Sequence, residues 1–163
     1  PRLLDMGIEP FLIASTVNTI IGQRLLRRIA KRHETYQSTP IETQNIMATV
    51  GHLLPKTPEE VARVSADLGY KDLPLAGQSA YTLVRGIDSP QAPNGYSGRA
   101  GIYEVMDVND SIQQLIINRA TSGEIQRLAV TQGMITMRQD GYLKALAGVT
   151  TLEEVNRVTS DTA

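Results

Sequence analysis

The sequence has no cysteine, no tryptophan and a single phenylalanine among its 163 residues. Without cysteine the chain cannot form disulfides, thiolate zinc sites, iron–sulfur clusters or a cysteine nucleophile. Only 4% of the residues are aromatic, so aliphatic side chains and methionine must fill the interior. The hydrophobic fraction of 41% is sufficient for a real core, and the length predicts one ordinary domain or a domain fragment.

The sequence also lacks an excess of one charge and a long apolar run. Lysine and arginine number 16 against 17 acidic residues, whereas domains that bind nucleic-acid backbone carry a strong positive excess, so nucleic acid is not the expected partner. The most apolar stretch, residues 11–21, contains four polar residues and is shorter than the roughly 20 apolar residues that span a bilayer. No signal peptide is visible, and a start at Pro1 instead of methionine indicates a sequence trimmed from something longer.

Motifs for catalysis and metal binding are missing as well. The only histidines, His33 and His52, are nineteen residues apart, and no His-x-x-x-His or Glu-x-x-His grouping accompanies them. The sequence contains neither a Gly-x-Ser-x-Gly elbow nor a Gly-x-x-x-x-Gly-Lys-Ser/Thr phosphate loop. We therefore predict no catalytic residue and no metal site in this chain.

Hydrophobic periodicity predicts a wide-striped helix from Phe11 to about Lys31. Its far end would carry Arg24, Arg27, Arg28 and Lys31 on one face. Cations are favourable at a helix C-terminus. The alternative is a basic edge that faces a nucleotide, an acidic neighbour or anionic lipid.

The remainder of the sequence predicts a proline-rich middle followed by short helices. Within residues 32–95, Thr57-Pro58-Glu59-Glu60 predicts a capped helix that ends at Gly69, and residues 80–85 are a strand candidate. Residues 102–108 predict a second strand. Capping-box spacing then marks helix starts at three pairs: Thr121 and Glu124, Thr136 and Gln139, Thr151 and Glu154.

The glycine-rich segment 94–101 (Asn-Gly-Tyr-Ser-Gly-Arg-Ala-Gly) has two interpretations. Its backbone N–H groups and Arg99 could bind a phosphate. Phosphate loops of known type, however, lead into a helix, whereas this segment leads into a predicted strand, which favours a simple tight turn.

Two blocks of sequence resemble a known family. The first is residues 2–29, with the strings Asp-Met-Gly-Ile-Glu-Pro-Phe-Leu and Gln-Arg-Leu-Leu-Arg; the second is residues 95–158, which opens Gly-Tyr-Ser-Gly-Arg-Ala-Gly-Ile-Tyr-Glu-Val. Both resemble the C-terminal part of the type II secretion and type IV pilus assembly ATPases. The two blocks cover a little over half of the chain, at both ends and in the family's order.

This resemblance implies an α/β fold: the C-terminal portion of a RecA-like P-loop ATPase domain, followed by a mainly α-helical C-terminal region. Residues 1–31 would end the RecA-like domain, residues 32–94 would be a variable insert, and residues 95–163 would form a strand and the helical region. The parent would be a homo-hexamer that hydrolyses ATP with Mg, in the cytoplasm at the inner membrane, with inner-membrane platform proteins as partners. Because the phosphate loop would precede Pro1, the fragment alone is not expected to be active or to hold ATP.

The resemblance also identifies a departure and two candidate residues. Many family members carry a four-cysteine zinc module whose slots would fall near Ala30, His33, Asp88 and Gln91; without cysteine, zinc is not expected here, and the insert would replace the module. Arg99 matches the arginine of the family's Gly-Tyr-x-Gly-Arg string and is our candidate for nucleotide contact, with Arg24 as a second residue that helps shape the same pocket.

The rival hypothesis is a stand-alone, non-enzymatic protein-interaction module that binds a protein partner. The missing phosphate loop, the missing cysteines and the short capped helices motivate it. A small helical DNA-binding domain is a distant third. The sequence does not distinguish secretion from pilus extension, DNA uptake or conjugation.

Overall fold

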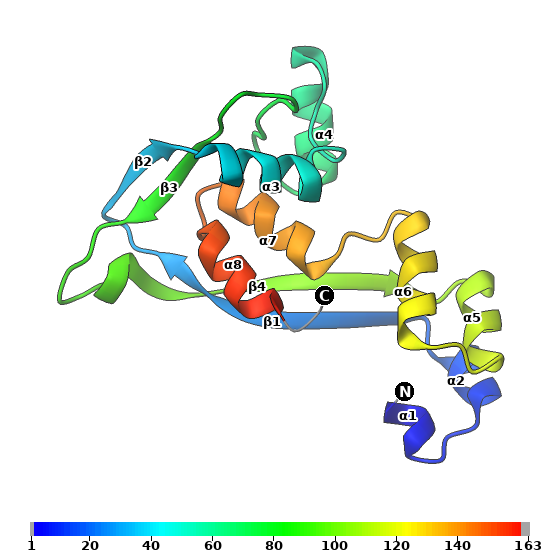
Figure 1. The fold of residues 1–163 in the computed structure, drawn as a ribbon. Coiled ribbons are helices and arrows are strands. Elements are labelled where there is room, and N and C mark those ends of the chain that lie inside the picture. The colour runs from blue at the N-terminus through cyan, green and yellow to red at the C-terminus, as the bar shows by residue number, and fades with distance from the viewer. Residues whose placement is uncertain (1, 161–163) are drawn as a thin grey trace. The chain divides into compact units, whose positions relative to one another are not determined.

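A computed structural model describes residues 2–160 of the chain. Short helices and strands are interspersed up to Asp107, and only helices follow that residue in the described part of the chain, as Figure 1 shows. In chain order the elements are α1 (Arg2–Asp5), α2 (Pro10–Thr16), β1 (Thr19–Ile29), β2 (His33–Gln37), α3 (Pro40–Val50), η1 (Pro58–Glu60), α4 (Val61–Asp67), β3 (Thr82–Gly86), η2 (Pro93–Gly95), β4 (Tyr96–Asp107), α5 (Asp110–Ile117), α6 (Ser122–Thr131), α7 (Met137–Leu146) and α8 (Leu152–Thr159). The fold is therefore mixed α/β with small sheets.

The described strands form two ribbons, β1 with β4 and β2 with β3. At one end of the first ribbon, the N–H of Val108 donates to the carbonyl of Asn18 at 2.8 Å. At the other end, the N–H of Ala30 donates to the carbonyl of Gly95 at 2.9 Å, so β1 and β4 run antiparallel. The second ribbon is also antiparallel, with a register from His33 opposite Gly86 to Gln37 opposite Thr82.

The prediction of one helix from Phe11 to Lys31 is wrong. Helix α2 ends at Thr16, and β1 begins at Thr19. The β-branched residues Thr19, Ile20 and Ile21 favour an extended backbone, and hydrogen bonding to β4 decides the outcome over the helical periodicity. The arginines of this segment therefore lie on a strand and not on one helical face.

Chain packing divides the molecule into two compact units. Unit 1 contains the residues up to Gln23 together with Tyr103–Thr136, and unit 2 contains Arg24–Ile102 together with the residues from Met137 onward. The predicted division at residues 31 and 94 stays a prediction.

Unit 1 packs α2 against α5, and α5 against α6. Its buried core comprises Ile13, Ala14, Val108, Ile112, Ile116 and Ala129, with Met106 and Ile125 packed against it. The capping box predicted for this unit is confirmed, because Thr121 and Glu124 form it completely on α6. At the start of α5, the Asn109 side chain accepts from the N–H of Ile112. These caps fix where two short helices begin.

Unit 2 has the larger core, in which α7 packs on α3, on α8 and on β3. Its fully buried side chains include Leu26, Ile46, Val50, Leu83, Ile102, Tyr142, Leu143 and Val155. A Cβ at Gly141 of α7 would overlap the side chain of Val155 on α8, so glycine lets the two helices approach closely.

The middle segment contains more helices and strands than the sequence predicts. The predicted helix corresponds to η1 followed by α4, and Gly69 takes a positive φ of 82° just after it. The predicted cap is wrong: the Thr57 side chain makes no cap hydrogen bond, and the Glu60 carboxylate accepts from the N–H of Lys56 at 2.9 Å. The predicted strand is β3. Helix α3 is not among the predicted elements, although Thr39 and Glu42 form a complete capping box with Pro40 in the first turn.

Candidate functional site

Both candidate nucleotide-contact residues belong to unit 2. Arg99 lies near the start of β4, is exposed, and follows Gly98, whose φ is +80°. Arg24 lies on β1, is half-buried, and donates from its guanidinium to the carbonyl of Val158 at the end of α8. Among the described residues, no hydrogen bond or ion pair joins the two arginines to each other. The structure thus places Arg99 in solvent and Arg24 in a tertiary contact.

The glycine-rich segment forms a tight turn that leads directly into a strand, as predicted. Asn94 and Gly95 have positive φ values of 56° and 79°, and β4 begins at Tyr96. The backbone of Gly95 lies against that of Gly86 so closely that a Cβ on either residue would overlap the other's carbonyl group. Glycine is required there for the close backbone approach, and the turn is not followed by a helix N-terminus that could receive a phosphate.

The free edge of β1 is covered by α8 and the residues before it. The backbone N–H of Arg27 donates to Oε1 of Glu154 at 2.9 Å, and the carbonyl of Arg27 accepts from the Thr150 hydroxyl at 2.9 Å. Two residues on, the N–H of Ile29 donates to the carbonyl of Val149 at 3.0 Å. A carboxylate, a hydroxyl and a carbonyl therefore take the place of a neighbouring strand and protect the edge.

Glu154 is the one charged residue that is buried in the described part of the chain, with 0% of its surface exposed. Its carboxylate accepts from Arg27 Nη2 at 2.7 Å and from Arg157 Nη2 and Nε at 2.6 and 2.9 Å. The two arginine side chains remain 44% and 57% exposed, so each guanidinium reaches water while it neutralises the buried carboxylate. The ion pairs and hydrogen bonds from the two arginines offset the desolvation free energy of the buried carboxylate.

The pKa of Glu154 reflects two opposing causes. Burial by itself raises the pKa, and the hydrogen bonds from Arg157 and Arg27 outweigh that effect and lower it from 4.5 to about 2. The same bonds raise the pKa of both arginines. Glu154 is therefore ionised throughout the neutral range and cannot act there as a proton donor.

Arg27 and Tyr96 extend this cluster to β4. The guanidinium carbon of Arg27 lies 4.2 Å from the centroid of the Tyr96 ring, within the range of a cation–π contact. The Tyr96 hydroxyl lies 2.7 Å from the Thr151 hydroxyl at the N-cap of α8. We name Arg27, Tyr96, Glu154 and Arg157 the edge cluster, because together they join β1, β4 and α8.

The four positions that match the zinc slots of the resembling family do not fit such a site. Ala30 has no ligand atom, and the carboxylate of Asp88 accepts from the N–H of Asn94 at 2.6 Å. Backbone bonds join the two segments instead: Ala30 donates to Gly95, and the N–H of Ile87 donates to the carbonyl of Arg32 at 3.0 Å. Among residues 2–160 no group of three or more potential ligand side chains is close enough to hold a metal ion.

Sequence reasoning misses the edge cluster as a unit, although it marks Glu154 within it and Thr151 beside it. The spacing of Thr151 and Glu154 predicts a reciprocal capping box. Thr151 does cap α8, accepting from the N–H of Glu154 at 3.2 Å, but the Glu154 carboxylate turns to the arginines instead. The signal available in the sequence is the Glu154–Arg157 spacing of three, which places the pair on one helical face. The sequence marks Arg27 only within a run of cations that could face an acidic neighbour, and nothing local identifies Glu154 as that neighbour.

Comparison with known proteins identifies the class of protein. Residues 1–157 match the family described as Type II/IV secretion system protein, and the chain belongs to that family. Among its relatives, the chain is similar to the type II secretion system protein E of Xanthomonas campestris pv. campestris, with 37% identity over 161 residues. It is 34% identical over 160 residues to the type IV pilus assembly ATPase PilB of Pseudomonas aeruginosa and 35% identical over 160 residues to the type II secretion system protein E of the same organism.

These alignments cover nearly all of this chain and little of the relatives. Each takes in 98% of the chain, but only 24% of the first two relatives and 27% of the third. The chain thus spans about a quarter of the length of the curated relatives it matches. The resemblance carried by residues 2–29 and 95–158 is confirmed, and it extends across the middle segment as well. No helix within residues 2–160 is long and apolar enough to cross a membrane.

Proposed function

We propose that this chain is the C-terminal segment of a hexameric motor ATPase that powers type II secretion or type IV pilus assembly. Its membership of the Type II/IV secretion system protein family carries this proposal, together with relatives that include pilus assembly ATPases. Because the chain has no phosphate-loop lysine, ATP and Mg would be held mainly by the rest of the parent. The parent would act in the cytoplasm at the inner membrane, against platform proteins of the secretion or pilus machine.

Within this function, Arg99 is the residue of the chain that we assign to the nucleotide. Arg99 is exposed on a strand that follows a closely packed turn, and within residues 2–160 no hydrogen bond or ion pair holds its guanidinium, so it can receive an anionic phosphate. Arg24 plays a different part, because it holds the end of α8 on β1 and so shapes the surface around the site. The edge cluster on the same two strands keeps their spacing fixed.

An experiment on the parent protein tests this assignment. Arg99→Ala should weaken ATP binding or slow hydrolysis by about tenfold, the loss expected for one charge-assisted hydrogen bond. Arg63→Ala is the matched control, because Arg63 is an exposed arginine on α4 that, among residues 2–160, pairs only with Asp67 of its own helix. Unchanged kinetics for Arg99→Ala would remove Arg99 from the nucleotide site.

The same measurement distinguishes a motor ATPase from the rival function, a stand-alone protein-interaction module. A stand-alone interaction module would show no nucleotide dependence at all, in the wild-type protein or in either variant. If the parent hydrolyses ATP and the Arg99→Ala variant does so at the same rate, the motor assignment stands and the assignment of Arg99 to the nucleotide site fails.

A further inference from the structure

The β2–β3 ribbon of unit 2 has a regular ladder that fixes which backbone groups of β2 face its partner. At one end the N–H of Ser38 donates to the carbonyl of Tyr81 at 2.8 Å, and at the other the N–H of Ile87 donates to the carbonyl of Arg32 at 3.0 Å. In an antiparallel pair only every second residue bonds to the partner strand. The N–H and carbonyl groups of the alternate residues of β2 therefore point away from β3; these residues are His33, Thr35 and Gln37.

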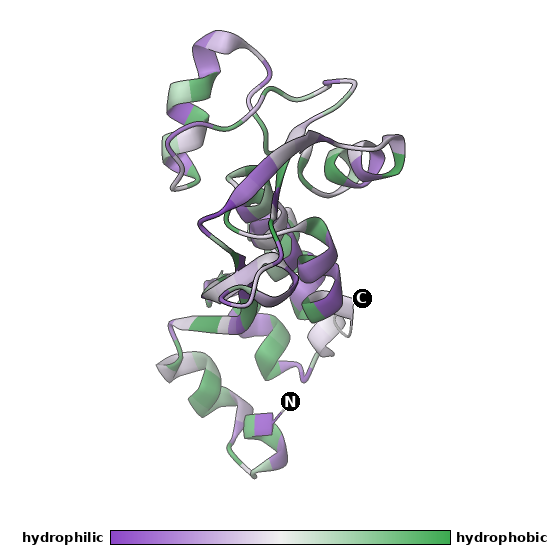
Figure 2. Cartoon of the chain, turned by 90° about the vertical axis from the view of Figure 1, so that its left-hand side faces the viewer, coloured by the Kyte–Doolittle hydropathy of each residue, from purple (hydrophilic) through white to green (hydrophobic). Residues whose placement is uncertain are grey.

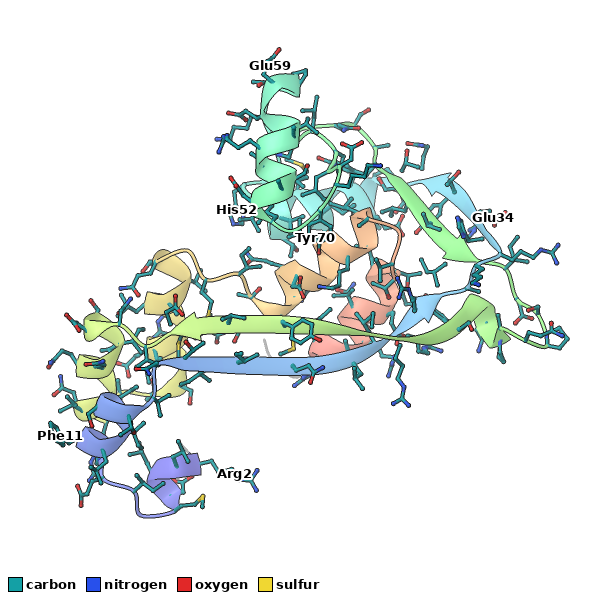
Figure 3. The ribbon with its side chains drawn as sticks, turned by 180° about the vertical axis from the view of Figure 1, so that it is seen from behind. Arg2, Phe11, Glu34, His52, Glu59 and Tyr70 are labelled. Carbon is teal, nitrogen blue, oxygen red and sulfur yellow. The ribbon has the colours of Figure 1, made fainter. Side chains whose placement is uncertain are left out.

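This outer edge of β2 is open. Within residues 2–160 no hydrogen bond reaches its outward N–H and carbonyl groups, and all three of the residues that carry them are exposed. The other side of the ribbon is covered, because β3 packs on α7 and η2. Figures 1 and 3 show β2, which carries Glu34, on the outer side of β3, with α7 on the opposite side. An unpaired edge of this kind is a template for another strand, and a third strand stabilises a two-stranded ribbon.

The side chains of β2 are polar, which restricts how a partner can bind. The strand reads His-Glu-Thr-Tyr-Gln, and Figure 2, seen from this side, shows it in hydrophilic colours. Its largest side chain, Tyr36, is half-buried against the core of unit 2 and donates from its hydroxyl to Glu42 at 3.0 Å. Binding at this edge therefore depends on the backbone. The group that offers donors and acceptors at the spacing of a strand is an extended polypeptide.

Positive charge lies at the N-terminal end of the same edge. Lys31 and Arg32 immediately precede β2, are exposed, and form no ion pair within residues 2–160. Glu34, the acidic residue of β2, pairs with Arg85 at 2.6 Å. The carboxylate of Asp88, just beyond β3, already accepts a backbone N–H at 2.6 Å. A segment that pairs with the edge would thus meet two cations that are free to bind carboxylates.

We propose that the outer edge of β2 binds an extended, acidic segment of a protein partner, which adds a third strand to the ribbon. Antiparallel pairing is the more stable arrangement, and it places the C-terminal end of the segment beside the N-terminal end of β2. The acidic residues of the segment therefore belong at its C-terminal end, next to Lys31 and Arg32. This surface requires neither Arg99 nor ATP, so it goes beyond the proposed function.

Fluorescence anisotropy with the parent protein tests the proposal. The probe is a labelled peptide of alternating threonine and valine that ends in two glutamates, and a second peptide ends in two lysines instead. We expect the acidic peptide to bind about tenfold more tightly at low salt, with a difference that shrinks as salt is added. The acidic peptide with N-methylated backbone amides keeps its charge but cannot donate hydrogen bonds, so it should show no measurable binding.

Thr35→Pro is the test variant of the protein. It removes an N–H that points away from β3, and proline is tolerated where the N–H of an edge strand faces outward, so the fold should be retained. Thr35→Ala is the matched control, because it loses the same side chain and keeps the N–H. We expect the acidic peptide to bind Thr35→Pro about tenfold or more weakly and Thr35→Ala like the wild type. If thermal melts show that Thr35→Pro is unfolded, the N-methylated peptide makes the same comparison on the wild-type protein.

The charge assignment has its own variant. Replacement of Lys31 and Arg32 together by glutamate should reverse the preference, so that the peptide ending in lysines binds more tightly than the acidic one. Equal binding of the two peptides to the wild-type protein would overturn the acidic partner.

Three further results would overturn the proposal. Equal affinity of the acidic peptide for the wild type and a folded Thr35→Pro variant would show that the backbone of β2 is not the site. Self-association of the parent that Thr35→Pro abolishes, without peptide binding, would assign the edge to a second copy of the chain. Binding to phosphatidylglycerol vesicles that needs Lys31 and Arg32, again without peptide binding, would assign the cations to a membrane surface.

Discussion

Replacement of Glu154 by glutamine tests the physical reasoning behind the edge cluster. The carboxylate is fully buried and receives four hydrogen bonds, from the Arg27 backbone and from the guanidinium groups of Arg27 and Arg157. Glutamine has nearly the same shape, but it has lost the negative charge and presents an NH₂ group to donors. In the variant, N–H donors of Arg27 and Arg157 therefore face the NH₂ group of the glutamine, which is also a donor, at the edge of β1.

The magnitude follows from the pKa of Glu154. Its fall from 4.5 to about 2 corresponds to about 3 kcal/mol of folding free energy at neutral pH, at about 1.4 kcal/mol per pKa unit. Removal of one partner from a buried ion pair commonly costs a similar amount. For a chain of this size we expect the melting temperature to fall by about 6–12 °C.

The pH dependence has a defined sign. Because the pKa is lower in the folded state than in the unfolded state, the stabilisation is present above pH 4.5 and is lost as the pH falls from there through about 2. The difference in unfolding free energy between wild type and Glu154→Gln should be constant from about pH 5 to about pH 8 on this reasoning, and should shrink as acid is added.

Urea unfolding followed by circular dichroism measures the effect, with Glu153→Gln as the matched control. Glu153 undergoes the same chemical change one residue earlier in α8, but it is exposed, so its loss should cost only a few tenths of a kcal/mol. Equal unfolding free energies for the two variants would refute the reasoning, as would a Glu154→Gln deficit that does not change between about pH 7 and about pH 3.

Further predictions concern the turn and the helix caps. Gly86→Ala should destabilise unit 2 by about 2 kcal/mol or more, because the added Cβ overlaps the carbonyl of Gly95. Gly123→Ala in α6 is the control: its Cβ meets only an ordinary contact at 3.5 Å, so this variant should be neutral or stabilising by up to about 1 kcal/mol. Thermal melts compare the two variants, and a Gly86→Ala variant with an unchanged melting temperature would contradict the close approach of the Gly86 and Gly95 backbones. Thr39→Ala should cost about 1 kcal/mol by removing the cap of α3, measurable as faster amide exchange in that helix, whereas unchanged exchange would show that packing alone defines its start.

Local chemistry predicts the short elements of this chain well. The cap at Thr121, the helix ending before Gly69 and the turn at Asn94–Gly95 each depend on residues close together in sequence. Such features can be predicted from sequence because the interacting groups are fixed by spacing alone.

The failures involve partners that are distant in sequence. Residues 19–29 have helical periodicity, yet they form a strand because β4, some eighty residues later, supplies the hydrogen bonds. The edge cluster escapes prediction for the same reason: Arg27 and Glu154 are 127 residues apart. For Arg99 and Arg24 only the positions are now known, and their roles stay predictions.

ATP hydrolysis by the parent protein tests the central claim most directly. The full-length protein and the 163-residue chain would be assayed side by side for phosphate release in the presence of Mg. We predict turnover by the full-length protein and none by the chain alone, because the chain has no phosphate-loop lysine. A full-length protein that neither binds nor hydrolyses ATP, or a chain that hydrolyses it unaided, would contradict the assignment to a motor ATPase.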